Sequence, residues 1–165
     1  MLSGNLNELK NNDFKGFLSV ESLMENGCKT IPKEKGVYLV LNNKNKYSFM
    51  DKNVGGHFKG KNPTLSLDVL VDNWVENSDI LYIGKAGGSA SKANLQSRLK
   101  QYMRFGSGEA VGHWGGRLIW QIKNNRELLI AYKILDNVEP RLYEKSLISD
   151  FIDCYKKLPF ANLQK

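Results

Sequence analysis

The stretch Gly36-Val37-Tyr38-Leu39-Val40-Leu41 indicates the fold most clearly, because it is a dense apolar run rich in β-branched and aromatic residues. Such a run is typical of a buried β-strand. Similar runs follow at residues 79–84 and 128–135. Because no helical crossover is recognisable between the first two runs, the sequence predicts a small, mainly antiparallel sheet of three strands.

Helices are expected around these strands. Residues 5–26 read as helical, with Ser19 as an N-cap and Gly27 at the end. A stripe of apolar residues predicts a helix over residues 92–105. Pro140 suits the first turn of a final helix that runs to about residue 158. Helices flanking a small sheet give the α+β class.

The length of 165 residues fits one domain over residues 1–165, and 41% hydrophobic with 25% charged residues is a globular composition. We expect an N-terminal helical extension at residues 1–33 and an insertion at residues 43–78 between the first two strands. Residues 64–74 read either as a short helix or as a strand. The insertion should have some structure of its own, because a structureless loop of this length is unusual.

The sequence also indicates where in the cell the protein is expected. Its apolar runs are far shorter than the roughly 20 residues of a membrane helix. Residues 1–15 lack the apolar segment of a secretory signal. Cys28 and Cys154 are too isolated for a disulfide framework or a zinc site. We therefore expect a cytoplasmic protein with reduced thiols and no membrane contact.

The net charge is +7, from 24 Lys and Arg against 17 Asp and Glu. An excess of this size favours an anionic partner, and nucleic acid is the commonest. Basic proteins of other classes share this property, so the function has to be argued from particular residues.

Two charged residues lie beside apolar helix faces. Glu144 precedes Leu147 and Ile148 by three and four residues, so it shares the face that packs inward. A carboxylate there is unfavourable unless it is paired, hydrogen-bonded or bound to metal. Arg98 borders the apolar stripe of the helix at 92–105. A structural Arg98–Glu144 ion pair is one interpretation, and a catalytic site is the other.

Gly36-Val37-Tyr38 and Tyr82-Ile83-Gly84 together resemble the paired motif of the GIY-YIG nuclease superfamily. The resemblance continues in order with Arg98 fourteen residues after Gly84, Glu144 on a later helix, and Asn162 in the segment Pro159-Phe160-Ala161-Asn162. It covers about residues 34–164. Residues 115–120, Gly-Gly-Arg-Leu-Ile-Trp, look like the compact, restriction-endonuclease-like branch. A short loop usually separates the two motif strands, whereas residues 43–78 intervene here.

The resemblance implies a single-metal endonuclease that hydrolyses DNA phosphodiester bonds. Glu144 would bind Mg²⁺ or Mn²⁺, and Arg98 would bind phosphate oxygens. Either Tyr38 or Tyr82 would take a proton from the attacking water. Because a free tyrosine has a pKa of about 10, positive charge from the metal or from Lys85 would be needed.

Further roles follow from the same resemblance. Tyr102, one turn after Arg98 where some relatives carry His, would be an auxiliary group, and Asn162 would orient phosphate or water. The residues expected to contact DNA are Lys92, Lys100, Arg104, His113 and Arg117. The lysines of residues 43–61 either contact DNA too or are simply solvated.

The partner expected is double-stranded DNA, and the chain would act as a monomer or a homodimer. The alternatives are a catalytically inactive nucleic-acid-binding module, or a repair or mobile-element nuclease that needs a partner. A protein unrelated to nucleic acid, with a structural Arg98–Glu144 pair, is a third.

Overall fold

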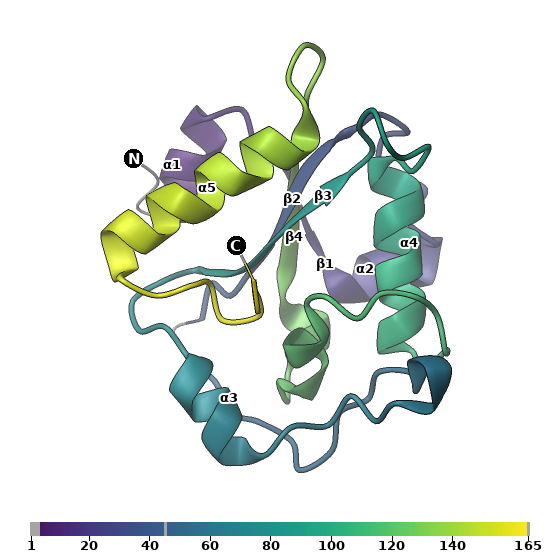
Figure 1. Cartoon of the computed structure of the whole chain (residues 1–165), viewed down its shortest axis with the longest axis vertical. Helices are drawn as coiled ribbons and strands as arrows, with labels where there is room; N and C mark the ends of the chain where they lie inside the picture. The colour runs from purple at the N-terminus through teal and green to yellow at the C-terminus, as the bar shows by residue number, and fades with distance from the viewer. Residues whose placement is uncertain (1–3, 45, 165) are drawn as a thin grey trace.

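The computed structural model describes residues 4–44 and 46–164. At its centre is a four-stranded antiparallel sheet with the order β1-β4-β2-β3. The strands are β1 (Lys15–Ser19), β2 (Gly36–Leu41), β3 (Ile80–Ala86) and β4 (Leu129–Ile134). Helices flank this sheet (Figure 1), so the predicted α+β class and the antiparallel pairing are confirmed. The expected number of three strands was too small by one.

The extra strand, β1, lies in the segment that was expected to be wholly helical. Residues 5–26 form α1 (Leu6–Asn11), β1 and α2 (Val20–Asn26), so the N-terminal extension contributes to the sheet. β1 pairs with β4, and its register shifts between Gly16 and Leu18. Gly16 has a positive φ of 92° and its neighbour Phe17 one of 51°. This short, irregular edge strand has no alternating apolar pattern, which is why local sequence gave no strand signal.

The ends of the helices follow local chemistry. The Ser19 hydroxyl accepts a hydrogen bond from Ser22 N at 3.1 Å, and Gly27 ends α2 in the left-handed conformation, both as expected. The predicted helix at 92–105 is α4 (Leu95–Gly106), which Asn94 caps. The final helix, α5 (Pro140–Tyr155), has proline at its first position and ends at Lys156, whose φ is 59°.

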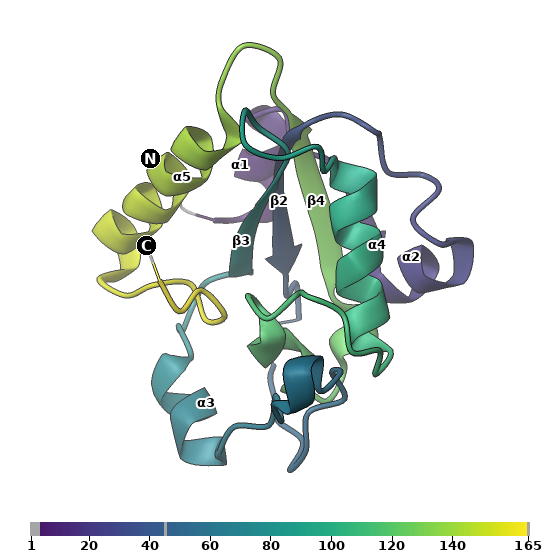
Figure 2. The ribbon, with the colours of Figure 1, turned by 45° about the vertical axis from the view of Figure 1, so that its right-hand side comes forward.

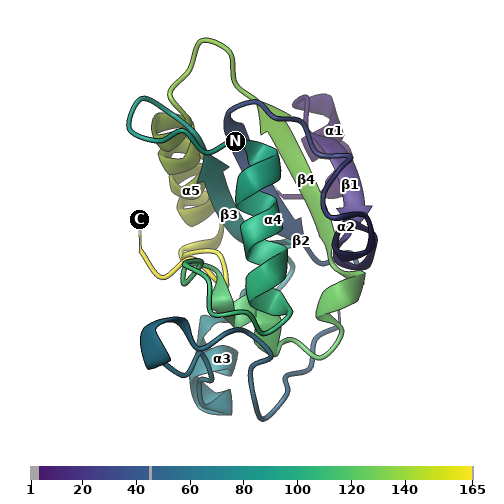
Figure 3. The same cartoon turned by 90° about the vertical axis from the view of Figure 1, so that its right-hand side faces the viewer.

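Two hydrophobic layers cover the sheet. Apolar side chains of α1 and α5, including Leu147 and Phe151, pack on Val37, Leu39 and Ile83. The opposite layer joins α2 and α4 to the other face of the sheet. Figures 2 and 3 show α1 and α5 on one side of the sheet and α2 and α4 on the other.

Residues 43–44 and 46–78 are largely exposed, but they are attached to the rest of the protein at several points. They contain η1 (Phe58–Gly60) and α3 (Leu67–Asn73), so the segment at 64–74 is largely helical. The buried Gln121, in η2 (Arg117–Gln121), accepts a hydrogen bond from Leu65 N and donates to the carbonyl oxygens of Leu65 and Met50, at 3.0, 2.8 and 3.0 Å. After η2 the chain forms η3 (Asn125–Glu127) and enters β4.

The C-terminal segment covers part of the edge strand β3. Ala161 N donates to the Leu81 carbonyl oxygen at 2.8 Å. The Asn162 amide accepts from Ile83 N and donates to Ile83 O, both at 2.9 Å. The tail therefore occupies the place of a neighbouring strand along half of β3. Among the described residues, no helix has the length and apolar content needed to cross a lipid bilayer.

Candidate active site

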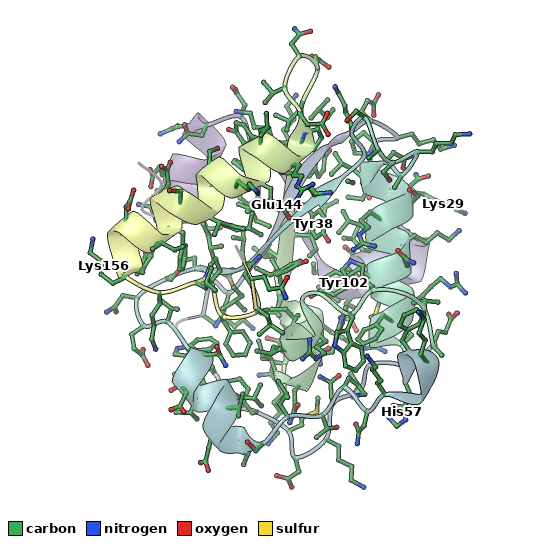
Figure 4. All side chains as sticks on the ribbon, viewed as in Figure 1. Lys29, Tyr38, His57, Tyr102, Glu144 and Lys156 are labelled. Carbon is green, nitrogen blue, oxygen red and sulfur yellow. The ribbon has the colours of Figure 1, made fainter. Side chains whose placement is uncertain are left out.

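A pocket of about 200 Å³ lies where β2, β3, α4 and α5 meet. Five of the residues singled out from the sequence line it: Tyr38 from β2, Tyr82 and Lys85 from β3, Arg98 from α4, and Glu144 from α5. Figure 4 shows Tyr38 and Glu144 close together between α5 and α4. We call this the first pocket. Its remaining wall comes from Ala86 at the end of β3 and from Gly87, Ser91 and Ala93 in the chain that follows.

The glycines of the two strand motifs have a steric role. Tyr38 and Gly84 are opposite each other in the β2–β3 register. A Cβ atom on Gly84 would lie 2.4 Å from Cζ of the Tyr38 ring, so only glycine lets this ring cross β3. A Cβ atom on Gly36 would lie 2.1 Å from the Lys133 carbonyl oxygen. The motif spacing therefore places the Tyr38 ring against β3.

Tyr38, Tyr82 and Tyr102 form an aromatic cluster with ring centroids 6.0–6.4 Å apart. Tyr38 is fully buried, whereas Tyr82 retains 8% exposure. Burial raises the pKa of Tyr82 to about 12, against a smaller lowering by Arg98. Burial, reinforced by the neighbouring Tyr82, raises the pKa of Tyr38 well above its ordinary value. Both hydroxyls are therefore protonated at neutral pH in the protein alone.

Glu144 is half-buried, and this burial raises the pKa of its carboxyl group although Lys85 and Arg98 lower it. The residues that the structure describes form no Arg98–Glu144 ion pair. Arg98 Nη1 instead donates to Gln101 Oε1 at 2.9 Å. The structural ion pair considered as an alternative is thus not formed, and both charges face the pocket without neutralising each other directly.

A second pocket of about 330 Å³ shares Tyr82 and Glu144 with the first. Its wall includes Trp114 and Arg117, and the Arg117 guanidinium lies 4.6 Å from the centroid of the Trp114 ring. Arg117 is half-buried, and burial lowers its pKa. Trp114 was not among the residues chosen from the sequence, where its place beside the Gly115-Gly116-Arg117 loop was the available signal.

Tyr102 and Asn162 lie differently from expectation. Tyr102 is fully buried, and its hydroxyl donates to the Gly116 carbonyl oxygen at 2.8 Å. It therefore packs inside the protein as part of the tyrosine cluster. Asn162 reaches the second pocket, but both ends of its amide are bonded to the main chain of Ile83. Both side chains thus have structural partners, and the expected roles of Tyr102 as an auxiliary group and of Asn162 in orienting phosphate or water stay predictions.

His113 also departs from expectation, because its side chain is fully buried and cannot form part of a DNA-binding surface. Its Nε2 lies 3.2 Å from the Tyr38 hydroxyl, and its Nδ1 lies 2.9 Å from the Gly115 carbonyl oxygen. Sequence reasoning placed His113 near the site, but it could not detect a contact across 75 residues.

The basic residues expected to contact DNA lie in different surroundings. Lys100 and Arg104 line a shallow groove along α4 that also includes Arg98. Arg104 already binds Glu109, with 2.7 Å between Nη2 and Oε2. Lys92 is exposed in the turn before α4. Arg98 therefore connects the first pocket to a basic surface along α4.

Within residues 4–44 and 46–164, no three His, Cys, Asp or Glu side chains gather as a metal-binding group. The side chains with oxygen atoms that line the first pocket are those of Glu144, Tyr38, Tyr82 and Ser91. No protein-family model, curated protein or solved structure matches this chain.

Proposed function

We propose that the protein is a divalent-metal-dependent endonuclease that hydrolyses DNA phosphodiester bonds through a GIY-YIG-type site. The observation that carries this proposal is the first pocket, which gathers one carboxylate, a guanidinium, an ammonium and two phenol hydroxyls from four elements. Burial raises the pKa of Glu144 without a direct ion pair to offset the effect. Clustered groups with shifted pKa values are typical of functional sites.

The donor set of this pocket fits Mg²⁺ or Mn²⁺. These hard cations prefer oxygen ligands, keep several waters and commonly share their coordination with a substrate phosphate. One protein carboxylate is therefore sufficient, and Glu144, which lines both pockets, would hold the ion. When bound, the cation supplies positive charge that stabilises the negative charge developing on the phosphate.

Arg98 and Lys85 bind the scissile phosphate. A guanidinium presents a planar fork of donors that matches two phosphate oxygens. Of the guanidinium nitrogens of Arg98, only Nη1 has a hydrogen bond within the described structure, to the neutral amide of Gln101, so the guanidinium keeps donors for an anion. Lys85 adds a second cationic group on the wall of the same pocket.

Tyr38 and Tyr82 hold the attacking water. Their hydroxyls are protonated in the protein alone, because burial raises both pKa values. Nearby positive charge favours the phenolate, and Arg98 already lowers the pKa of each tyrosine. Once substrate and cation add to that charge, a tyrosine at this position can lose its own hydroxyl proton to solvent, and the resulting phenolate can accept the water proton.

Double-stranded DNA crosses the two pockets and the groove along α4. Arg98, Lys100 and Arg117 neutralise successive phosphates, and the net charge of +7 favours association with any DNA. A monomer with one such site nicks one strand, and a homodimer cuts both. We place this activity in the cytoplasm.

The test is cleavage of supercoiled plasmid with Mg²⁺ or Mn²⁺, with EDTA as the metal-free control. Glu144→Gln should abolish cleavage, because the amide has no charge with which to hold the cation, while DNA binding in low salt is retained. Asp153→Asn is the matched control on the same helix, because Asp153 is exposed and the substitution removes the same charge as Glu144→Gln. It should cleave like the wild type.

Retained cleavage by Glu144→Gln would refute the assignment of Glu144. If the wild-type protein binds DNA but cuts none of a panel of duplex, nicked, flapped and branched substrates, the inactive binding module replaces the nuclease as the better explanation. If DNA binding is absent as well, the nucleic-acid function itself is wrong.

A further inference from the structure

His113 occupies a position that the proposed catalytic set does not explain. It lies between α4 and η2, in a loop whose neighbouring glycines contact the tyrosine cluster. Its ring stacks on Tyr102 with centroids 4.2 Å apart and an interplanar angle of 19°. Its two nitrogens point to Tyr38 and Gly115. A fully buried imidazole with a partner at each nitrogen has one defined orientation.

The partners also define the positions of the hydrogens. A carbonyl oxygen can only accept, so the 2.9 Å contact with Gly115 O places a hydrogen on Nδ1. Burial and the nearby Arg98 lower the pKa of His113 to about 3, so the ring is neutral and Nε2 carries a lone pair. At 3.2 Å from that lone pair, the Tyr38 hydroxyl must be the donor.

We propose that His113 is a positioning residue for Tyr38. By accepting the hydroxyl hydrogen at Nε2, it leaves only the oxygen lone pairs of Tyr38 for the neighbouring Tyr82 hydroxyl and for the first pocket. Tyr38 can then accept a hydrogen bond from the attacking water but cannot donate one to the phosphate. Of the two motif tyrosines, Tyr38 is thus the one whose hydroxyl oxygen is oriented to accept a hydrogen bond from the attacking water.

This inference rests on the proposed nuclease function for its consequence, but the hydrogen-bond direction can be measured without any activity. In ¹⁵N-labelled wild-type protein at neutral pH, the histidine nitrogen shifts should report a protonated Nδ1 and an unprotonated Nε2 for His113. Tyr38→Phe should shift the Nε2 resonance, because the phenylalanine ring donates no hydrogen bond. A protonated Nε2, or an Nε2 resonance unaffected by Tyr38→Phe, would overturn the proposal whether or not the protein cuts DNA.

Two substitutions separate the two nitrogens of His113. The His113→Asn amide reaches the place of Nδ1, so it retains the donor to Gly115 but loses the acceptor for Tyr38. The His113→Gln amide reaches the place of Nε2 and retains that acceptor. His113→Asn should lower kcat on the order of tenfold with KM unchanged, about the effect of one hydrogen bond on a barrier. His113→Gln should restore most of that loss.

A double-mutant cycle tests whether His113 acts through Tyr38. If it does, adding His113→Asn to Tyr38→Phe should cost no further activity. Additive losses would show an independent effect of His113 and would overturn the positioning role. If no form of the protein cuts DNA, the nuclease function fails, and the nitrogen shifts alone decide whether His113 fixes the Tyr38 hydroxyl.

Discussion

Single residues in this protein are constrained by neighbours on other strands. Gly84 shows this most directly, because the ring of Tyr38 occupies the space that a side chain at Gly84 would need. Tyr38 in turn donates to His113, which stacks on Tyr102. A change at one of these positions therefore affects side chains beyond its direct neighbours.

Gly84→Ala should both destabilise the protein and reduce cleavage. Its Cβ would lie 2.4 Å from the Tyr38 ring, so the ring must move, and overpacking of this kind costs about 1–3 kcal/mol. Urea denaturation measures the loss. Gly112→Ala is the control, because its Cβ would meet nothing closer than 3.4 Å and φ is not positive there. Equal stability of Gly84→Ala and the wild type would refute the proposed steric role.

His113 should make stability depend on pH. Its pKa falls from 6.5 to about 3 on folding, so between these values the unfolded chain binds more protons than the folded protein. Stability contributed by the neutral ring is complete above pH 6.5 and is lost as pH falls toward 3, by up to about 5 kcal/mol. Arg98 opposes protonation, while Tyr38 and Tyr102 contact the ring.

The measurement compares urea unfolding of wild-type protein and His113→Gln between pH 7 and pH 4. The wild type should lose stability relative to the variant as pH falls, because glutamine does not titrate. A constant difference across this range would contradict a buried neutral histidine.

At the scale of elements, hydrogen bonds from side chains to main chain decide how irregular segments attach to the sheet. Asn162 fixes the C-terminal segment on the edge of β3, and Gln121 fixes residues 43–78 beside η2. The insertion also adds Trp74 to an aromatic cluster with Phe49 and Phe160. These contacts therefore anchor the insertion to the core of the protein.

Gln121→Ala should strongly destabilise the protein, because it leaves main-chain groups of Met50 and Leu65 without partners. Buried polar groups left unpaired cost about 1–3 kcal/mol each, so the expected loss is about 3 kcal/mol or more. Gln96→Ala, which removes one hydrogen bond to the Ile31 carbonyl, should cost about 1 kcal/mol. Urea denaturation of both variants provides the comparison.

Amide hydrogen exchange measures the local effect of Gln121→Ala on the insertion. Exchange at Leu65 N should accelerate in Gln121→Ala and not in Gln96→Ala, since Leu65 N donates to Gln121. Similar losses of stability in the two variants would mean that Gln121 does not anchor the insertion.

The whole molecule carries an excess of positive charge, but its basic residues are not equivalent. Arg104 is exposed and paired with Glu109, whereas Arg117 is half-buried in the wall of the second pocket and has no carboxylate partner among the described residues. Affinity for DNA depends on how many phosphates are neutralised, and each contributes about 0.9 to the slope of log K against log salt.

Arg117→Gln should therefore reduce the salt slope of DNA binding by about one, and Arg104→Gln should reduce it by clearly less. Fluorescence anisotropy with a labelled duplex across a salt series measures both slopes, with Glu144→Gln as the background to prevent cleavage. If Arg104→Gln changes the slope as much as Arg117→Gln, the DNA path is not the one across the second pocket.

The sequence alone determined the class of the fold and the main residues of the pocket. Three apolar runs, an amphipathic helix and Pro140 are local signals, and the strands and helices that they predict are present. Tyr38, Tyr82 and Arg98 could be selected because their order resembles the paired GIY-YIG motif, and Glu144 also because it lies on a helix face that packs inward. Their chemical meaning as a nuclease site remains a proposal.

Only the tertiary structure decided which candidates face the pocket and which support it. His113, Tyr102 and Asn162 have partners 14 to 79 residues away, so no local pattern could separate a ligand from a structural anchor. β1 could not be recognised because its pairing with β4 and its irregular backbone, not an alternating apolar pattern, make it a strand. A periodic pattern of apolar residues indicates which face of an element is buried. The hydrogen bonds of a side chain depend on which distant residues the fold places beside it.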